Sequence, residues 1–140
     1  QATLGNSQLS RIKNIVKMRH TVGLRYYKNL RNNKNLFMPE PKKKFAKNIY
    51  WVIAILITNK KIKLDALKVM KKLKNLGIGT RPFFWPMNKQ KVLKKFIVKT
   101  HNKFLNSSYI SKYGFYLPSS LSLKNTEIDY ICKKINNILK

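Results

Sequence analysis

The chain has 140 residues, room for one domain with a modest core, and its 44% apolar content excludes a disordered chain. A net charge of +27 makes nucleic acid a candidate partner, but of the 31 basic residues five are arginine and 26 are lysine, spread along the chain. Arginine is the preferred contact to phosphates and bases, so a solvated basic surface is favoured over a dedicated nucleic-acid face.

The cysteine content and the apolar runs indicate the compartment. Cys132 is the one cysteine, so no intrachain disulfide forms and a reducing, cytoplasmic setting is expected. The longest apolar run, residues 49–57, is too short to span a bilayer, and no membrane partner is expected. The first residue is Gln1 rather than Met, which suggests a piece of a longer chain.

A long helix is predicted first. Apolar residues recur at helical spacing from Thr3 to Asn33, with a possible interruption at Gly23. A small domain cannot bury so long a helix alone, so residues 1–35 are expected to form an interdomain helix. Residues 36–140 are assigned to the small domain, which begins with an extended, Pro-rich connector.

The next elements alternate between strand and helix. The β-branched and aromatic run at residues 49–57 predicts the best strand of the chain. Residues 64–76 predict a helix that ends at Gly77, and a short strand is expected at residues 78–83. The inward side chains expected for this helix are Leu67, Met70, Leu73 and Leu76.

The last third predicts two weaker helical segments, at residues 89–96 and 104–112, and an extended segment at residues 114–118. A closing helix runs from about Thr126, with an apolar stripe of Ile128, Ile131, Ile135 and Ile138. This order predicts an α/β (α+β) sandwich, in which a small, mostly antiparallel sheet carries helices on one side and follows a long helix.

Few residues offer catalytic chemistry. Asp65 and Glu127 fall in the first turns of predicted helices, where a carboxylate offsets the helix dipole. His20 and His101 have no companions at metal-ligand spacing, and Cys132 lies beside the stripe of the last helix, as a buried apolar residue would. No self-sufficient catalytic or metal site is predicted. The acidic residues are Glu40, Asp65, Glu127 and Asp129.

Residues 77–90, GIGTRPFFWPMNKQ, are the most unusual segment of the chain, since aromatic, proline and arginine residues crowd a stretch too irregular for a plain helix or strand. Strand alternation predicts that Phe83 and Phe84 point to opposite faces, and that Arg81 and Trp85 share the face of Phe83. One of the three rings is expected in the core. A face with guanidinium, phenyl and indole groups suits a flat or anionic ligand.

The same segment carries a family resemblance. It is similar to the C-terminal domain of DegT/StrS-type, pyridoxal-phosphate-dependent sugar-nucleotide aminotransferases, and its TRPFFWPM wording resembles the perosamine-synthase-like branch. Three more blocks agree in order and spacing across nearly the whole chain. They are QATLGNSQLSRI at residues 1–12, YWV at residues 50–52, and YGFYLPSS followed by IDYI at residues 113–120 and 128–131.

The resemblance implies an aspartate-aminotransferase-like (fold type I) enzyme, a homodimer with sites at the interface. A lysine of the large domain would bind pyridoxal phosphate, and glutamate would donate the amino group to a nucleotide-linked keto sugar, in polysaccharide biosynthesis. The large domain is absent from this sequence, so no catalytic or cofactor-binding residue is assigned. This chain is expected to be inactive alone and to bind no cofactor by itself.

The substrate side of the cleft is expected to be lined by Arg81, Phe83, Trp85, Met87 and Asn88, with histidine in many relatives where Asn88 stands here. Arg81 would pair with an anion of the donor or of the nucleotide sugar. Two alternatives remain open: a stand-alone basic module that binds nucleic acid, and a non-functional remnant of a truncated gene. Self-association is expected through the first helix or the aromatic segment.

Overall fold

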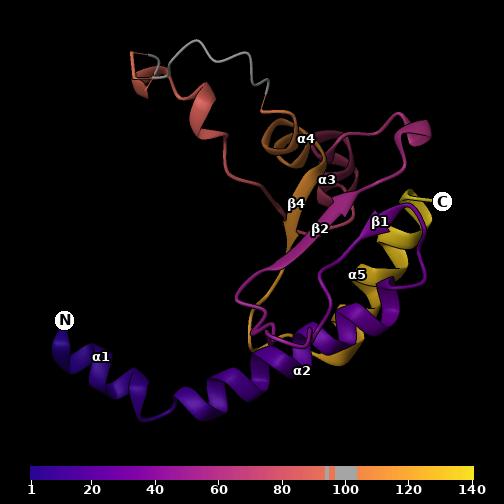
Figure 1. The fold of residues 1–140 in the computed structure, drawn as a ribbon. Helices are drawn as coiled ribbons and strands as arrows, with labels where there is room; N and C mark the ends of the chain where they lie inside the picture. Colours follow the sequence, from indigo (N-terminus) through magenta and orange to yellow (C-terminus); the bar gives the residue numbers. More distant parts are fainter. Residues whose placement is uncertain (94, 97–103) are drawn as a thin grey trace.

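A computed structural model describes residues 1–93, 95–96 and 104–140 (Figure 1). His101 and part of the helical segment expected at residues 89–96 lie outside the described residues. The helices are α1 (Ala2–Leu9), α2 (Ile12–Leu30), α3 (Ala66–Lys74), α4 (Leu105–Tyr113) and α5 (Asn125–Ile138), and the strands are β1 (Leu36–Phe37), β2 (Ile53–Ile57), β3 (Arg81–Pro82) and β4 (Gly114–Leu117).

The strands form one four-stranded sheet of order β1-β2-β4-β3, and all its pairings are antiparallel. Register places Ile53 opposite Leu117 and Ile55 opposite Phe115. Side chains of a strand alternate between faces, so these four buried residues belong to one face of the sheet. The predicted architecture of a small antiparallel sheet in an α/β domain is confirmed.

Helices cover the apolar face of the sheet. α2 and α5 lie side by side (Figure 1), and both bring buried side chains to the core, such as Tyr26 and Leu30 from α2 and Ile131 and Ile135 from α5. α3 adds Val69 and Leu73 to the same cluster. Among the described residues, no helix is both long and apolar enough to cross a membrane.

The expected first helix is two helices, and its predicted interruption at Gly23 is wrong. The break lies at Ser10 and Arg11, where the Arg11 N–H bonds the carbonyl of Gln8, three residues back, and tightens the turn. Gly23 lies inside α2 and is buried. A β-carbon there would lie 2.1 Å from the ring of Tyr50, so this glycine permits close packing and does not end the helix.

The inward face expected for the third helix is partly wrong. Leu73 is buried as predicted, but Leu67 is 67% exposed, and the buried stripe also contains Ala66 and Val69. The smaller side chains let the helix approach the sheet, which a choice of the largest apolar residues does not anticipate. The predicted end at Gly77 is confirmed, since Gly77 has a φ of 75° in the left-handed region.

Several strand and helix boundaries also differ from those predicted. The strand expected at residues 49–57 starts at Ile53, because the Tyr50 backbone is left-handed, with φ 52°. The strand expected at residues 78–83 pairs only at β3. In the described part of residues 89–96, the expected helix is replaced by short 3-10 turns at Met87–Lys89 and Lys91–Leu93. The elements expected at residues 104–112 and 114–118 and from Thr126 are confirmed as α4, β4 and α5.

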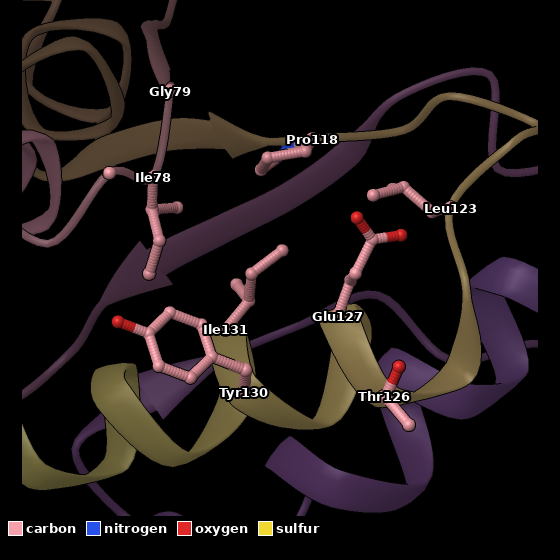
Figure 2. A pocket seen from close by; sticks show the side chains of 9 residues that line it. Ile78, Gly79, Pro118, Leu123, Thr126, Glu127, Tyr130 and Ile131 are labelled. Atoms are coloured by element: carbon pink, nitrogen blue, oxygen red, sulfur yellow. The ribbon is translucent and has the colours of Figure 1, made fainter.

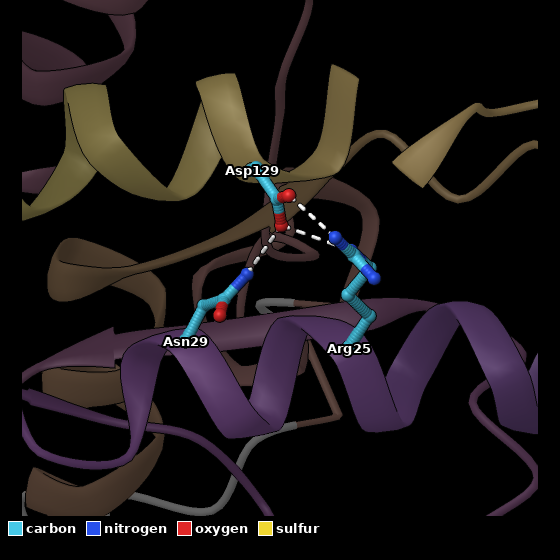
Figure 3. Close-up of polar contacts among 3 residues, drawn as sticks. All are labelled: Arg25, Asn29 and Asp129. Atoms are coloured by element: carbon cyan, nitrogen blue, oxygen red, sulfur yellow. Dashed lines mark hydrogen bonds and ion pairs between the residues drawn. The ribbon is translucent and has the colours of Figure 1, made fainter. Parts of the chain in front are cut away.

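A polar clamp joins α2 to α5 at their outer edge (Figure 3). The Arg25 guanidinium donates through Nε and Nη2 to the two carboxylate oxygens of Asp129, and the Asn29 amide donates to Asp129 Oδ1 at 2.7 Å. The hydrogen bonds from Arg25, with a smaller contribution from Asn29, lower the pKa of Asp129 below its ordinary value. The clamp fixes the two helices that carry much of the core.

Candidate functional site

The face of the sheet opposite the core carries the candidate site. Arg81 of β3 and Ala54 of β2 both lie opposite Tyr116 of β4, so the three residues share this face. The Phe83 ring stacks on Tyr116, with ring centroids 4.5 Å apart and an interplanar angle of 29°. Gly114 allows the approach, because a β-carbon there would lie 2.5 Å from the Phe83 ring.

A cleft of about 510 Å³ opens beside this aromatic pair. Two arginines from distant parts of the chain border it, Arg19 of α2 and Arg81 of β3. The Arg19 guanidinium donates to the Trp51 carbonyl at 3.0 Å, which fixes its position at the wall. Two guanidinium groups at one cleft favour an anionic ligand, a carboxylate or a phosphate. The other lining residues are Trp51, Val52, Gly79, Thr80, Tyr116, Leu117, Pro118 and Ser119.

The structure brings together only part of the predicted substrate face. Arg81 lines the cleft, and Phe83, half-buried, lies on the same face against Tyr116. Trp85, Met87 and Asn88 do not line the cleft. They belong to a segment that leaves the sheet and projects away from it (Figure 1).

The projecting segment has contacts of its own. The Trp85 indole Nε1 donates to the Lys89 carbonyl at 3.3 Å, and the Lys89 ammonium lies 5.5 Å from the centre of the indole ring. Trp85 is 59% exposed and Met87 is 69% exposed. Both side chains are therefore open to whatever packs beside this part of the chain.

Two predictions for the aromatic residues are wrong. Phe83 and Phe84 do not take opposite faces, because the strand ends at Pro82 and the alternation ends with it. Both rings contact Tyr116, Phe84 edge-on with centroids 6.3 Å apart. None of the three expected aromatic rings belongs to the buried core either, since Phe84 and Trp85 are exposed and Phe83 is half-buried.

Sequence reasoning missed Arg19 and Tyr116. Arg19 is one of five arginines among many lysines, and that scarcity was the available indication. Arg19 and Arg81 are far apart in the sequence, so the sequence does not indicate that they border one cleft. They do so only once α2 packs against the sheet. Tyr116 lies in an expected strand, but nothing local indicates which face of the strand it occupies.

A second cavity, of about 350 Å³, lies between the turn at Gly77–Gly79 and α5 (Figure 2). The Glu127 carboxylate on its wall accepts the backbone N–H of Lys124 at 2.6 Å, and the Tyr130 hydroxyl donates to the Leu76 carbonyl at 3.3 Å. Glu127 lies in the first turn of α5, as the sequence predicts, and also completes a capping box there. Asp65, expected in a first turn, is instead the N-cap of α3 and accepts the Lys68 N–H at 2.9 Å. The cavity offers no acid–base pair.

The remaining polar chemistry of the described residues is structural. No group of three metal-ligating side chains occurs among the residues that the structure describes. Cys132 is buried, as predicted, and burial raises the pKa of its thiol to about 12, so the thiol is not a nucleophile near neutral pH.

Pyridoxal phosphate requires particular side chains around it. An enzyme that uses this cofactor needs a Schiff-base lysine and a partner for the pyridine nitrogen. The cleft is lined by neither lysine nor carboxylate. The residues of this cleft therefore do not fit pyridoxal phosphate.

Residues 1–136 match the model of the DegT/DnrJ/EryC1/StrS aminotransferase family. The chain belongs to this family. Among curated proteins none matches the chain. Membership of the DegT/DnrJ/EryC1/StrS aminotransferase family agrees with the resemblance seen in the motifs of the chain.

Solved structures share the fold of this family member. An aminotransferase, TlmJ, from Streptoalloteichus hindustanus is 16% identical and superposes with a TM-score of 0.81, over 99% of this chain and 35% of its own. Helicobacter pylori PseC, an aminotransferase involved in the biosynthesis of pseudoaminic acid, is 18% identical and superposes with a TM-score of 0.83, over 97% of this chain and 36% of its own. The E. coli GDP-4-keto-6-deoxy-D-mannose-3-dehydratase with bound hydrated PLP is 20% identical and superposes with a TM-score of 0.78, over 97% of this chain and 33% of its own. The chain thus spans about a third of these proteins.

Proposed function

We propose that this chain is the small C-terminal part of a cytoplasmic, pyridoxal-phosphate-dependent aminotransferase that moves an amino group from glutamate to a nucleotide-linked keto sugar. The branch proposed is the perosamine-synthase-like one, in polysaccharide biosynthesis. The family match and the coverage of about a third of the solved relatives support this proposal. The large part would carry the Schiff-base lysine, so this chain alone would be inactive and would bind no cofactor.

The observation that carries the proposal is the approach of Arg19 and Arg81 to one cleft, beside the stacked rings of Phe83 and Tyr116. In this proposal Arg81 pairs with an anionic group of the donor or of the nucleotide sugar, as a planar fork suited to carboxylate or phosphate. Phe83 packs against the sugar and excludes water. The cofactor would supply the electron sink, and residues outside this chain would hold the cofactor.

We propose that a neighbouring part of the protein packs against Trp85, Met87 and Asn88. Their segment projects from the domain, so they would complete the substrate side only where the large part or a second subunit packs against them (Figure 1). Residues 1–35 would join the two parts of the protein and residues 36–140 would form the small domain.

We propose a homodimer, or another self-association, through α1 or the aromatic segment. α1 contributes no buried residue, and its Leu4 and Leu9 are 69% and 65% exposed. A chain that stays monomeric over a wide concentration range in sedimentation experiments would contradict this part of the proposal.

The site proposal is tested with Arg81→Ala in a protein that carries both parts. The expected result is a KM about tenfold to a hundredfold higher for one of the two substrates, because a charge-assisted contact is lost. Arg11→Ala is the matched control, since Arg11 is exposed and does not line the cleft. Unchanged kinetics of Arg81→Ala, or equal effects of both variants, would contradict the role of Arg81.

A further inference from the structure

A second surface, which shares no lining residue with the arginine cleft, lies along α2. It is a groove of about 400 Å³ between α2 and the segment at residues 41–47. Four lysines line it, Lys13 and Lys17 from α2 and Lys42 and Lys47 from the opposite wall. Val16 and Leu24 of α2 add apolar surface between the charges, and His20 of α2 and Pro41 complete the lining.

The wall opposite α2 is a hydrogen-bonded hairpin of residues 41–48. Lys42 and Lys47 form an antiparallel bridge, and the Lys43 N–H donates to the Ala46 carbonyl at 2.8 Å. The Asn48 N–H donates to the Pro41 carbonyl at 3.0 Å and closes the base of the hairpin. The two walls of the groove are therefore held by backbone hydrogen bonds, a helix on one side and a hairpin on the other.

The charge of the groove is not balanced from within. No carboxylate lines it. Glu40, the nearest acidic residue in the sequence, pairs with Lys43 at 2.7 Å. Lysines brought to one groove without a carboxylate repel each other and favour an anionic occupant.

A second copy of this chain does not supply that occupant. The sequence has four acidic side chains, and the structure engages each of them. Glu40 pairs with Lys43, Asp129 pairs with Arg25, and Asp65 and Glu127 cap helices. A copy with a net charge of +27 would bring more repulsion than attraction to this groove.

The apolar lining distinguishes among anionic partners. Nucleic acid would use arginines for phosphates, and none lines the groove. The one ring in the lining, His20, packs edge-on against Tyr50 with ring centroids 6.4 Å apart. A flat membrane surface would not enter a concave groove between two walls. A helix with one apolar stripe and acidic flanks matches both features, since its stripe meets Val16 and Leu24 while its carboxylates meet the lysines on the two walls.

We propose that this groove docks an acidic amphipathic helix of a partner protein. The apolar stripe of that helix lies on α2 between Lys13 and Lys17 on one wall and the hairpin on the other. No residue of the groove lines the arginine cleft, so an occupant of the groove leaves the proposed substrate face free. The groove includes residues 13–24 of the proposed interdomain helix, so the proposal rests on that face of α2 staying open in the whole protein.

The test uses the full chain and a synthetic, fluorescent helical peptide of about 18 residues, with leucines on one stripe and glutamates elsewhere. Binding is followed by fluorescence anisotropy at about 50 mM and about 300 mM salt. We expect saturable binding that weakens with salt. We also expect a shuffled peptide of the same composition, which lacks the stripe, to bind at least about tenfold more weakly.

Two variants place the binding on the groove. Lys13→Gln combined with Lys17→Gln should weaken binding about fivefold to tenfold, because two rim charges are lost. Lys71→Gln combined with Lys72→Gln, on the exposed side of α3, changes net charge equally and should leave binding unchanged. Leu24→Ser, at a half-exposed position, tests the apolar contact without removing charge.

Three results would overturn the proposal. In the first, the shuffled peptide binds as well as the striped one. In the second, the α3 pair of substitutions weakens binding as much as the α2 pair, which would show attraction to the whole basic surface. In the third, a single-stranded oligonucleotide or anionic vesicles of the same total charge displace the labelled peptide at a lower concentration than unlabelled peptide does. The α2 substitutions would then weaken the binding of that competitor and not the binding of the peptide.

Discussion

Arg25 on α2 and Asp129 on α5 pair across 104 positions of sequence, and their side chains form a two-point hydrogen-bonded ion pair. The pair lies at the edge of the interface, with about two fifths of each side chain exposed, so water and salt weaken it. Its value is geometric, since a bidentate contact fixes the relative position of the two helices that frame the core.

Asp129→Asn should change how the thermal stability of the chain depends on pH. The Arg25 contact lowers the pKa of Asp129, so its stabilising contribution is present above the ordinary Asp pKa and is lost as pH falls through the lowered value. The wild-type chain should therefore lose thermal stability below about pH 4, and Asp129→Asn should show a lower Tm at pH 7 with a flatter acid limb.

The control for that experiment is Asp65→Asn, because asparagine can still accept the capping hydrogen bond. Thermal unfolding followed by circular dichroism from about pH 3 to about pH 7 would compare the three proteins. Equal acid limbs for wild type and Asp129→Asn would contradict a stabilising role of this pair.

Gly23→Ala should destabilise the domain by about 2–3 kcal/mol, because the new methyl group would overlap the buried Tyr50 ring. Helix propensity alone predicts the opposite sign. Gly5→Ala is the matched control, since a β-carbon at Gly5 meets no atom within 4 Å. Urea unfolding of both variants measures the difference, and a Gly23→Ala protein as stable as wild type would show that Tyr50 can move aside.

Tyr26→Phe should leave stability unchanged or raise it by up to about 1 kcal/mol. Tyr26 is fully buried, its hydroxyl has no hydrogen-bond partner among the described residues, and burial raises the pKa of this hydroxyl above its ordinary value. Removing the oxygen removes a desolvated polar atom and keeps the ring. A clear loss of stability in urea unfolding would show that the hydroxyl has a favourable contact.

Cys132 should resist thiol reagents in the folded chain. Burial raises its pKa to about 12, so at about pH 8 the reactive thiolate is scarce as well as covered. Alkylation followed by mass spectrometry should show slow modification in buffer and rapid modification in denaturant. Equal rates in the two conditions would contradict the packing of α5 described here.

The sequence determined the elements whose information is local. The isoleucine stripe of α5, the β-branched run of β2 and the first-turn carboxylate of Glu127 depend on neighbours within a few residues, and the structure has them where periodicity and helix-end chemistry predict. The motifs also indicated the family, and the family model matches residues 1–136.

Tertiary structure decided what depends on distant contacts. Gly23 is read locally as a helix breaker, but the ring of Tyr50 makes it a packing position. Arg19 joins Arg81 at one cleft only because α2 packs against the sheet, and Phe84 turns toward Tyr116 because β3 ends after two residues. Local propensity fixes the period of an element, whereas its ends, its buried face and its neighbours depend on which packing of the whole chain has the lowest free energy.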